Sequence, residues 1–103
     1  MFQIDTDSYE IEMIRGDTAA FQICLNDYEL QEDDIMVMTV KKRKTDQEPL
    51  LTKYAEGNVI VLEPDDTINL VGKCVYDIQL TTSVGAVYTP ILSTITFQRG
   101  VTE

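Results

Sequence analysis

Apolar and polar residues alternate with a period of two along most of this chain, which is the spacing of β-strands. In Gly72–Thr82, for example, Cys74, Tyr76 and Ile78 share one face. Such stretches recur about every 8 to 15 residues between turn-forming residues, as in all-β domains. The strands predicted in this way are Glu10–Met13, Thr18–Leu25, Ile35–Lys42, Leu50–Tyr54, Gly57–Leu62, Gly72–Thr82 and Val87–Arg99. We expect Pro90 to break or bulge the last of them.

The connection between the fifth and sixth of these strands indicates the architecture. It contains Pro64–Asp65–Asp66–Thr67, which has the chemistry of a helix start. A short strand, one helical turn and a long strand carrying Tyr76 follow one another where a chain crosses between the sheets of an immunoglobulin-like sandwich. We therefore predict a single all-β domain over residues 1–103, an immunoglobulin-like β-sandwich of about seven to eight antiparallel strands. Residues 1–9 and 100–103 are expected to be loosely ordered.

The phase of each strand predicts the environment of the two cysteines. The residues expected to face the core are Phe21, Ile23 and Leu25, then Met36, Met38 and Val40, then Ile60 and Leu62. Cys24 lies out of phase with its apolar neighbours, whereas Cys74 lies in phase with Tyr76. The two side chains should therefore diverge, and we predict two free thiols rather than a disulfide between the sheets.

The charge of the chain disfavours two classes of partner. It has 18 acidic and 8 basic side chains, for a formal net charge of −10, which repels nucleic-acid phosphates and anionic membranes. No apolar run approaches the roughly 18 residues that span a bilayer. The first ten residues have neither a basic leader nor an apolar segment, so no signal peptide is predicted. We expect synthesis in the cytoplasm, no nucleic-acid partner and no membrane insertion.

The residue types needed for common catalytic sites are missing. The chain has no histidine, no CxxC pair and no glycine-rich phosphate loop, so we predict no enzyme activity, no cofactor and no metal site. Adjacent acids such as Asp65–Asp66 are usually turn formers rather than glycosidase pairs. The acidic loop, with Asp27, Glu29, Glu32, Asp33 and Asp34, lacks the ligand order of a calcium loop and is expected to be solvated.

The tripeptide Arg15–Gly16–Asp17 and the residue Tyr76 each have two possible interpretations. Arg15–Gly16–Asp17 is a tripeptide that some integrins bind, but it also suits a tight turn in which Asp17 bonds the backbone, and the turn is favoured. Tyr76 fits a tyrosine corner, in which a buried ring places its hydroxyl on the backbone of the preceding turn. A half-buried strand tyrosine fits equally well.

Opposite charges flank one predicted strand. Asp33 and Asp34 precede Ile35–Lys42, and the basic residues Lys41, Lys42, Arg43 and Lys44 end it, roughly 25 Å away at 3.3 Å per residue. We hypothesise that this polarity favours head-to-tail contacts between copies or with related domains. The alternative is a pair of solvated loops.

Several motifs together resemble one known family. They are MIRGDTAAF, MTVKKRK, VIVLEPDDTINL, GKCVYDIQLTT and a valine-rich last strand. The chain resembles the N-terminal β-sandwich domain of phage upper baseplate proteins, from prophages and siphophages of Gram-positive bacteria. The resemblance covers Ile11 to about Phe97, and its fold-defining positions fall on Arg15–Thr18, Lys41–Lys42, Pro64–Thr67 and Tyr76–Leu80. Members of that family continue into a coiled coil and a distal domain, whereas this sequence ends at Glu103.

The resemblance implies a structural docking module of a tail baseplate, made in the bacterial cytoplasm and then part of the virion. Its partners would be other tail proteins or copies of itself, including a homo-oligomer. One alternative is a carbohydrate- or cell-surface-binding module, for which the loops supply Tyr28 and Tyr88. A host-encoded immunoglobulin-like interaction domain is another, and a small hydrolase is disfavoured by the missing histidine.

Overall fold

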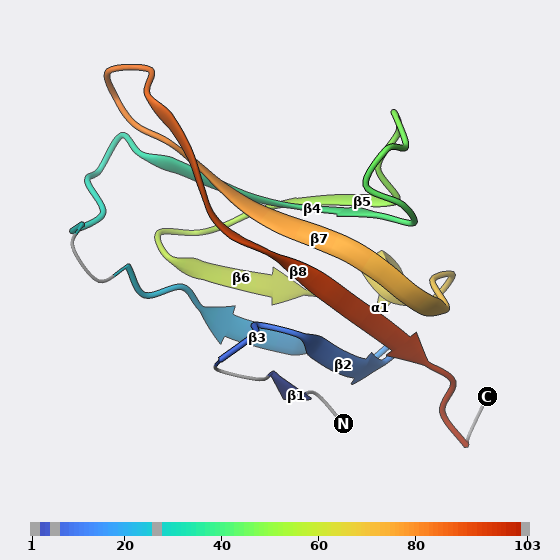
Figure 1. Cartoon of the computed structure of the whole chain (residues 1–103). Helices are drawn as coiled ribbons and strands as arrows, with labels where there is room; N and C mark the ends of the chain where they lie inside the picture. The colour runs from blue at the N-terminus through green and yellow to red at the C-terminus, as the bar shows by residue number, and fades with distance from the viewer. Residues whose placement is uncertain (1–2, 5–6, 26–27, 102–103) are drawn as a thin grey trace.

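The computed structural model describes residues 3–4, 7–25 and 28–101, and these residues are mostly β-strand. Eight strands and one short helix follow one another along the described chain (Figure 1). The strands are β1 (Gln3–Ile4), β2 (Ile11–Ile14), β3 (Ala19–Gln22), β4 (Ile35–Lys41), β5 (Leu51–Tyr54), β6 (Val59–Leu62), β7 (Gly72–Thr81) and β8 (Val87–Gln98). The helix α1 (Pro64–Thr67) lies between β6 and β7. The prediction of an all-β chain is therefore confirmed.

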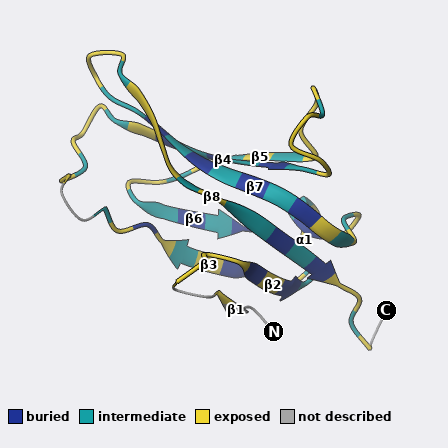
Figure 2. Cartoon of the chain, viewed as in Figure 1, coloured by how far each residue is buried: buried dark blue, intermediate teal, exposed yellow. Residues whose placement is uncertain are grey.

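The strands form two sheets with the apolar core between them. Six strands pair in the order β1-β2-β8-β7-β4-β5, and β3 pairs with β6 in a second sheet. The register of the small sheet places Ala19 opposite Leu62 and Phe21 opposite Ile60. Buried residues alternate along the strands that face the interior (Figure 2). They are Ile11, Met13, Ala19, Ile23, Met36, Met38, Val40, Ile60, Leu62, Cys74, Tyr76, Ile78, Leu80, Ile95 and Phe97.

The expectation that all strands are antiparallel was wrong at one pair. β2 runs parallel to β8, with Ile11 opposite Ile95 and Met13 opposite Phe97. Parallel neighbouring strands need a long connection. Here all the elements from β3 to β7 lie between β2 and β8 in the sequence. Hydrophobic alternation identifies the buried face of a strand but not the direction of its neighbour. The larger sheet is therefore mixed.

The predicted phases are confirmed in the strands with the clearest alternation. Met36, Met38 and Val40 are buried in β4, and Ile60 and Leu62 are buried in β6. The second strand ends earlier than predicted, at Gln22 instead of Leu25. Ile23, the first residue after β3, nevertheless remains next to the neighbouring segment. Its N–H donates to the Asn58 carbonyl at 2.7 Å, and its side chain is buried as predicted.

The last strand contains the irregularity expected at Pro90. The β7–β8 register passes from Ile78 opposite Ile91 to Leu80 opposite Tyr88. Gln79 of β7 therefore faces two residues of β8, Thr89 and Pro90, which is the arrangement of a β-bulge. Proline has no N–H to donate to the hydrogen-bond ladder between strands. The bulge places it where the ladder is already interrupted.

The N-terminal segment contains a strand that we did not predict. Gln3 and Ile4 pair with Glu12 and Ile11 as β1. Further along, the Ser8 carbonyl accepts a hydrogen bond from Ser93 Oγ at 2.9 Å. Of the two stretches expected to be loosely ordered, residues 1–2, 5–6 and 102–103 lie outside the described residues.

The cysteines diverge as predicted. Cys24 is exposed, Cys74 is buried, and both are free thiols. Burial raises the pKa of the Cys74 thiol, although the charge of Lys42 acts in the opposite direction.

Candidate functional site

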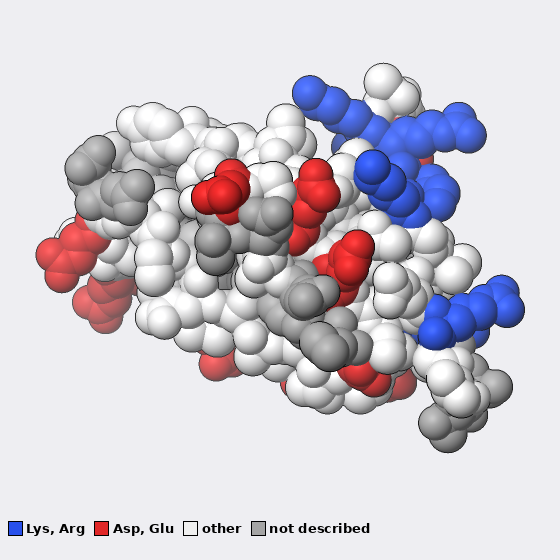
Figure 3. Space-filling model, turned by 60° about the horizontal axis from the view of Figure 1, so that its bottom comes forward, with Lys and Arg blue, Asp and Glu red and all other residues white. Residues whose placement is uncertain are grey.

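Most cationic residues lie toward one end of the molecule, here named the cationic end. It is the end at which β2, β4 and β8 finish and β7 begins. Lys41 is opposite Val75, Lys42 Nζ reaches the Lys73 carbonyl at 3.3 Å, and the Arg15 N–H donates to the Gln98 carbonyl. Figure 3 shows Lys and Arg gathered at the right of the view, while acidic side chains are spread over the molecule, including this side. The residues are Arg15, Lys41, Lys42, Arg43, Lys44, Lys73 and Arg99, with the acids Asp17, Asp46 and Glu48 in the same connections, whereas Lys53 lies midway along β4, opposite Met38.

The other end of β4 has the opposite charge and is named the acidic end. It consists of the β7–β8 hairpin and the described residues of the loop between β3 and β4, which project at the same side of Figure 1. Its acids are Glu29, Glu32, Asp33 and Asp34, and among the described residues it has no Lys or Arg. The molecule extends over 45 × 26 × 26 Å, and the acidic end, which has no cations among its described residues, is separated from the cationic end along β4.

Asp34 connects the two parts of the acidic end. Its Oδ2 accepts hydrogen bonds from the Tyr28 hydroxyl and from the Gln31 N–H at 2.8 Å, while Oδ1 accepts from the Ser83 N–H at 3.3 Å. The hydrogen bond from Tyr28 is the main reason that the pKa of Asp34 lies below its ordinary value. The same bond raises the pKa of Tyr28. Asp33, in contrast, is exposed, so the two adjacent acids have different roles.

An apolar pocket of about 470 Å³ opens at the acidic end. Its walls come from segments far apart in the sequence, because the β7–β8 hairpin faces the loop after β3. The Thr82 N–H donates to the Ala86 carbonyl at 2.8 Å, which continues the hairpin beyond the strands. The lining is mainly apolar and includes Leu25, Tyr28, Leu80, Ala86, Tyr88 and Pro90.

The sequence did not reveal this pocket. Tyr28 and Tyr88 stood out as loop aromatics, but their partnership depends on Leu80 and Tyr88 being opposite each other across the hairpin. A break or bulge at Pro90 was expected, but the strand pattern does not specify which residues pair on the far side of it. One indication of the pocket was present in the sequence: Tyr28 and Tyr88 are large aromatic residues in stretches that were not expected to contribute to the core.

The predicted turns at Arg15–Asp17 and Pro64–Thr67 lie against each other. Gly16 has φ +81°, a conformation that favours glycine, and its N–H donates to Thr67 Oγ1 at 2.8 Å. The Asp17 N–H donates to the Ile14 carbonyl at 3.2 Å and closes the turn. These residues therefore join two connections at the cationic end, which agrees with the turn interpretation of the tripeptide.

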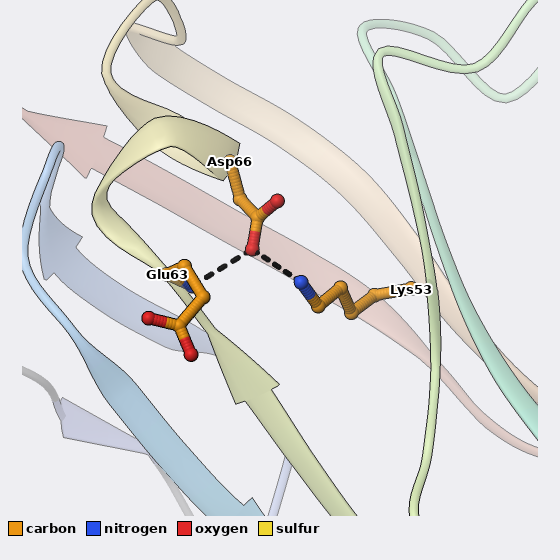
Figure 4. A network of polar contacts seen from close by, with 3 residues as sticks. All are labelled: Lys53, Glu63 and Asp66. Atoms are coloured by element: carbon orange, nitrogen blue, oxygen red, sulfur yellow. Dashed lines mark hydrogen bonds and ion pairs between the residues drawn. The ribbon is translucent and has the colours of Figure 1, made fainter.

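Asp66 organises the start of α1 (Figure 4). Its Oδ2 accepts hydrogen bonds from the Glu63 N–H and from Lys53 Nζ, both at 2.7 Å. Burial opposes ionisation of this carboxyl group, but the bonds from Lys53 and Glu63 outweigh it, so the pKa of Asp66 is lowered. A carboxylate in this position satisfies a backbone donor that the helix itself leaves unpaired.

Replacement of Asp66 by asparagine is expected to lower the free energy of unfolding by roughly 1 kcal/mol at neutral pH, because an amide oxygen cannot form the charged pair with Lys53. A carboxyl whose folded pKa is lowered stabilises the fold above its unfolded pKa, near 3.9, and this contribution disappears as the pH falls through the folded pKa. The difference between wild type and Asp66→Asn in urea unfolding should therefore vanish in acid. Asp65→Asn, which removes an exposed charge from the same turn, is the control. An equal loss in both variants would contradict the assigned role.

Tyr76 matches neither of its two sequence interpretations fully. Its ring is buried, with 2% of the residue exposed, so the half-buried alternative is wrong. Its hydroxyl donates to the Tyr9 carbonyl, which belongs to the N-terminal segment and not to the preceding turn, so the tyrosine-corner bond is also wrong. Burial, with a smaller effect from Tyr9, raises the pKa of Tyr76 to about 12. Tyr9 itself has φ +60°, so this bond accompanies an unusual backbone conformation.

Other kinds of site find little support in the described part of the chain. No three acidic or cysteine side chains among residues 3–4, 7–25 and 28–101 are grouped to hold a metal ion, and Asp27 lies outside those residues. No helix among them is long and apolar enough to cross a membrane. Comparisons with models of protein families, with curated proteins and with solved structures gave no match. The acidic-end pocket and the separated charges are therefore the features on which a function can be argued.

Proposed function

We propose that this chain is a non-enzymatic docking module of a phage or prophage tail baseplate. The observation that carries the proposal is the apolar pocket at an acidic end, opposite a cationic end, on a small β-rich domain. An apolar centre with charged surroundings is typical of surfaces that bind other proteins. The resemblance of the sequence to the N-terminal domain of upper baseplate proteins supplies the context. Other tail proteins or further copies of this chain are its partners.

The order of the strands supports the finer proposal of an immunoglobulin-like sandwich. In that arrangement strands B and E lie in one sheet, while C, F and G lie in the other. Here β3 pairs with β6, and β8, β7, β4 and β5 are neighbours in the larger sheet. These correspond to B and E, and to G, F, C and C′. The helix α1 then occupies the connection from E to F.

The proposed role also specifies where the protein is made and which residues and surfaces take part. The protein is made in the bacterial cytoplasm and becomes part of the virion with its tail. No catalytic step is assigned to it, since the chain lacks histidine and its adjacent acids have structural or solvated positions. Arg15, Gly16, Asp17, Pro64 and Asp66 maintain the turns, and the surfaces at the two ends make the contacts.

A second candidate function is a carbohydrate-binding module. The convergence of Tyr28 and Tyr88 on one pocket favours it, because sugars stack on aromatic rings. The scarcity of free polar groups disfavours it: the Tyr28 hydroxyl is already bonded to Asp34, and few hydroxyls remain in the lining. Sugar sites need precisely placed hydrogen-bonding groups. Docking of a protein is therefore the better-supported use.

The proposal is tested by mass spectrometry of particles purified after prophage induction of the source strain. Peptides of this chain are expected at a fixed ratio to the tail proteins, and the ratio gives the copy number in the baseplate. Matched samples are intact particles, particles with detached tails and the cell lysate. If the protein is plentiful in the lysate but missing from intact particles, the tail role is wrong and a host-encoded interaction domain takes its place.

A further inference from the structure

We propose that the acidic-end pocket receives the cationic end of a second copy, so that copies of this chain join head to tail. The inference deepens the docking role proposed above and rests on it, because it names the partner and the site. The two surfaces involved are different, and each copy has one of each. Their contact can therefore repeat from copy to copy.

The pocket requires a partner with an apolar centre and positive surroundings. Its lining is mainly apolar, so a charged side chain placed inside it would lose hydration without compensation. Glu29, Glu32 and Asp33 are exposed in the same loop as Tyr28, which lines the pocket. Carboxylates at this end attract Lys and Arg and repel other acids. An apolar side chain flanked by cations satisfies both conditions.

The cationic end of the same chain presents this combination. Lys42, Arg43 and Lys44 are exposed in the connection between β4 and β5. Leu50 closes that connection, because its N–H donates to the Val40 carbonyl at 2.7 Å, yet 46% of the residue is exposed. A large apolar side chain is thus displayed in a connection that carries three cations and, nearer to Leu50, the acids Asp46 and Glu48. Ile68, after α1, adds further apolar surface toward this end, with 42% exposed.

The arrangement of the two ends excludes a contact within one molecule. The β4–β5 connection and the pocket lie at opposite ends of β4, in a molecule 45 Å long. A chain therefore cannot place its own Leu50 in its own pocket, and a second copy must provide it. An interface between unlike surfaces leads to a closed ring or an open filament rather than a two-fold dimer.

Local charge outweighs net charge in this contact. Two copies with a formal charge of −10 each repel one another at a distance. At the contact, however, the exposed cations Lys42, Arg43 and Lys44 of one copy face the acidic end of the next. Opposite exposed charges are screened by salt, so association should be strongest at low ionic strength. Insertion of Leu50 into the pocket fixes the position of the partner copy, and the opposite charges fix its orientation.

Sedimentation velocity of the purified chain tests the inference. At about 0.02 M salt the mean sedimentation coefficient is expected to rise with protein concentration, and at about 0.5 M salt the rise should be at least tenfold weaker. Two variants each remove one surface: Tyr88→Asp places a carboxylate in the pocket, and Arg43→Glu with Lys44→Glu reverses the cationic end. Glu12→Lys, an exposed charge reversal on β2, is the control and should associate as the wild type does.

Mixing the two variants gives the decisive result. Each alone should stay monomeric, because neither can make the contact. A mixture should form a one-to-one dimer and nothing larger, since only one compatible pair of surfaces remains. Far-ultraviolet circular dichroism establishes that both variants are folded. If Tyr88→Asp is not, Asp33→Lys takes its place, because it reverses an exposed charge of the acidic end outside the pocket lining.

Two outcomes would overturn the inference. One is a wild-type protein that is monomeric at every concentration at low salt. The other is a dimer that both variants form alone, which would indicate a two-fold contact elsewhere. The tail role fails separately: a chain that associates head to tail but is missing from particles overturns that role alone, and a monomeric chain found in particles overturns this inference alone.

Discussion

Replacement of Tyr76 by alanine is expected to lower the free energy of unfolding by about 3–5 kcal/mol, the usual cost of removing a large buried aromatic side chain. Tyr76 lies in β7, between β8 and β4, and only 2% of it is exposed. Small domains unfold with about 5–15 kcal/mol, so this loss is a large part of the total. Urea unfolding followed by circular dichroism measures it.

Tyr76→Phe separates the ring from the hydroxyl. Phenylalanine keeps the packing but leaves the Tyr9 carbonyl without its donor, so a loss of about 1 kcal/mol is expected. The Phe variant should also loosen the N-terminal segment, which hydrogen exchange at residues 7–11 would report. If Tyr76→Ala lost no more than Tyr76→Phe, the ring would not be the core element described here.

Thr67→Val is expected to cost about 1–3 kcal/mol, although valine has nearly the same shape as threonine. Thr67 has no exposed surface, and its Oγ1 accepts the Gly16 N–H at 2.8 Å. Valine would leave this N–H without an acceptor, in a turn that is only partly open to water. The Arg15–Asp17 turn would then lose this hydrogen bond to α1.

Thr67→Ser is the matched control, because serine keeps the acceptor and removes one methyl group, at about 0.8 kcal/mol. Hydrogen exchange of the Gly16 amide distinguishes the two variants. It should accelerate in Thr67→Val and remain slow in Thr67→Ser. Equal protection of Gly16 in both would mean that the hydroxyl does not hold this turn.

The parts of the fold that could be predicted are those determined by local pattern. Burial in β4, β6 and β7 followed from strict alternation, and α1 followed from Pro64 and the acids after it. The bulge at Pro90 followed from the missing N–H of proline. β1 could not be predicted, since a two-residue strand has no periodicity and forms because β2 offers a free edge.

The candidate site was less predictable, because it depends on which strands become neighbours. The charges flanking β4 were evident, but the position of Arg15, Lys73 and Arg99 at the same end required the parallel pairing of β2 with β8. The pocket likewise required a hairpin and a loop from distant parts of the sequence to meet. The acceptor of the Tyr76 hydroxyl was unpredictable for the same reason. The Tyr9 carbonyl comes from the N-terminal segment, which is distant from Tyr76 in the sequence.

The parallel pair of β2 and β8 also constrains the order of events during synthesis. Ile11 and Ile95 are opposite each other, although they come from opposite ends of the sequence, and contacts of this kind slow folding. Because β8 lies between β2 and β7, the larger sheet cannot be completed before β8 has emerged from the ribosome. Until then one side of β7 is an unpaired edge with an apolar face, so a nascent chain paused before β8 is the form of this protein most exposed to aggregation and to chaperones.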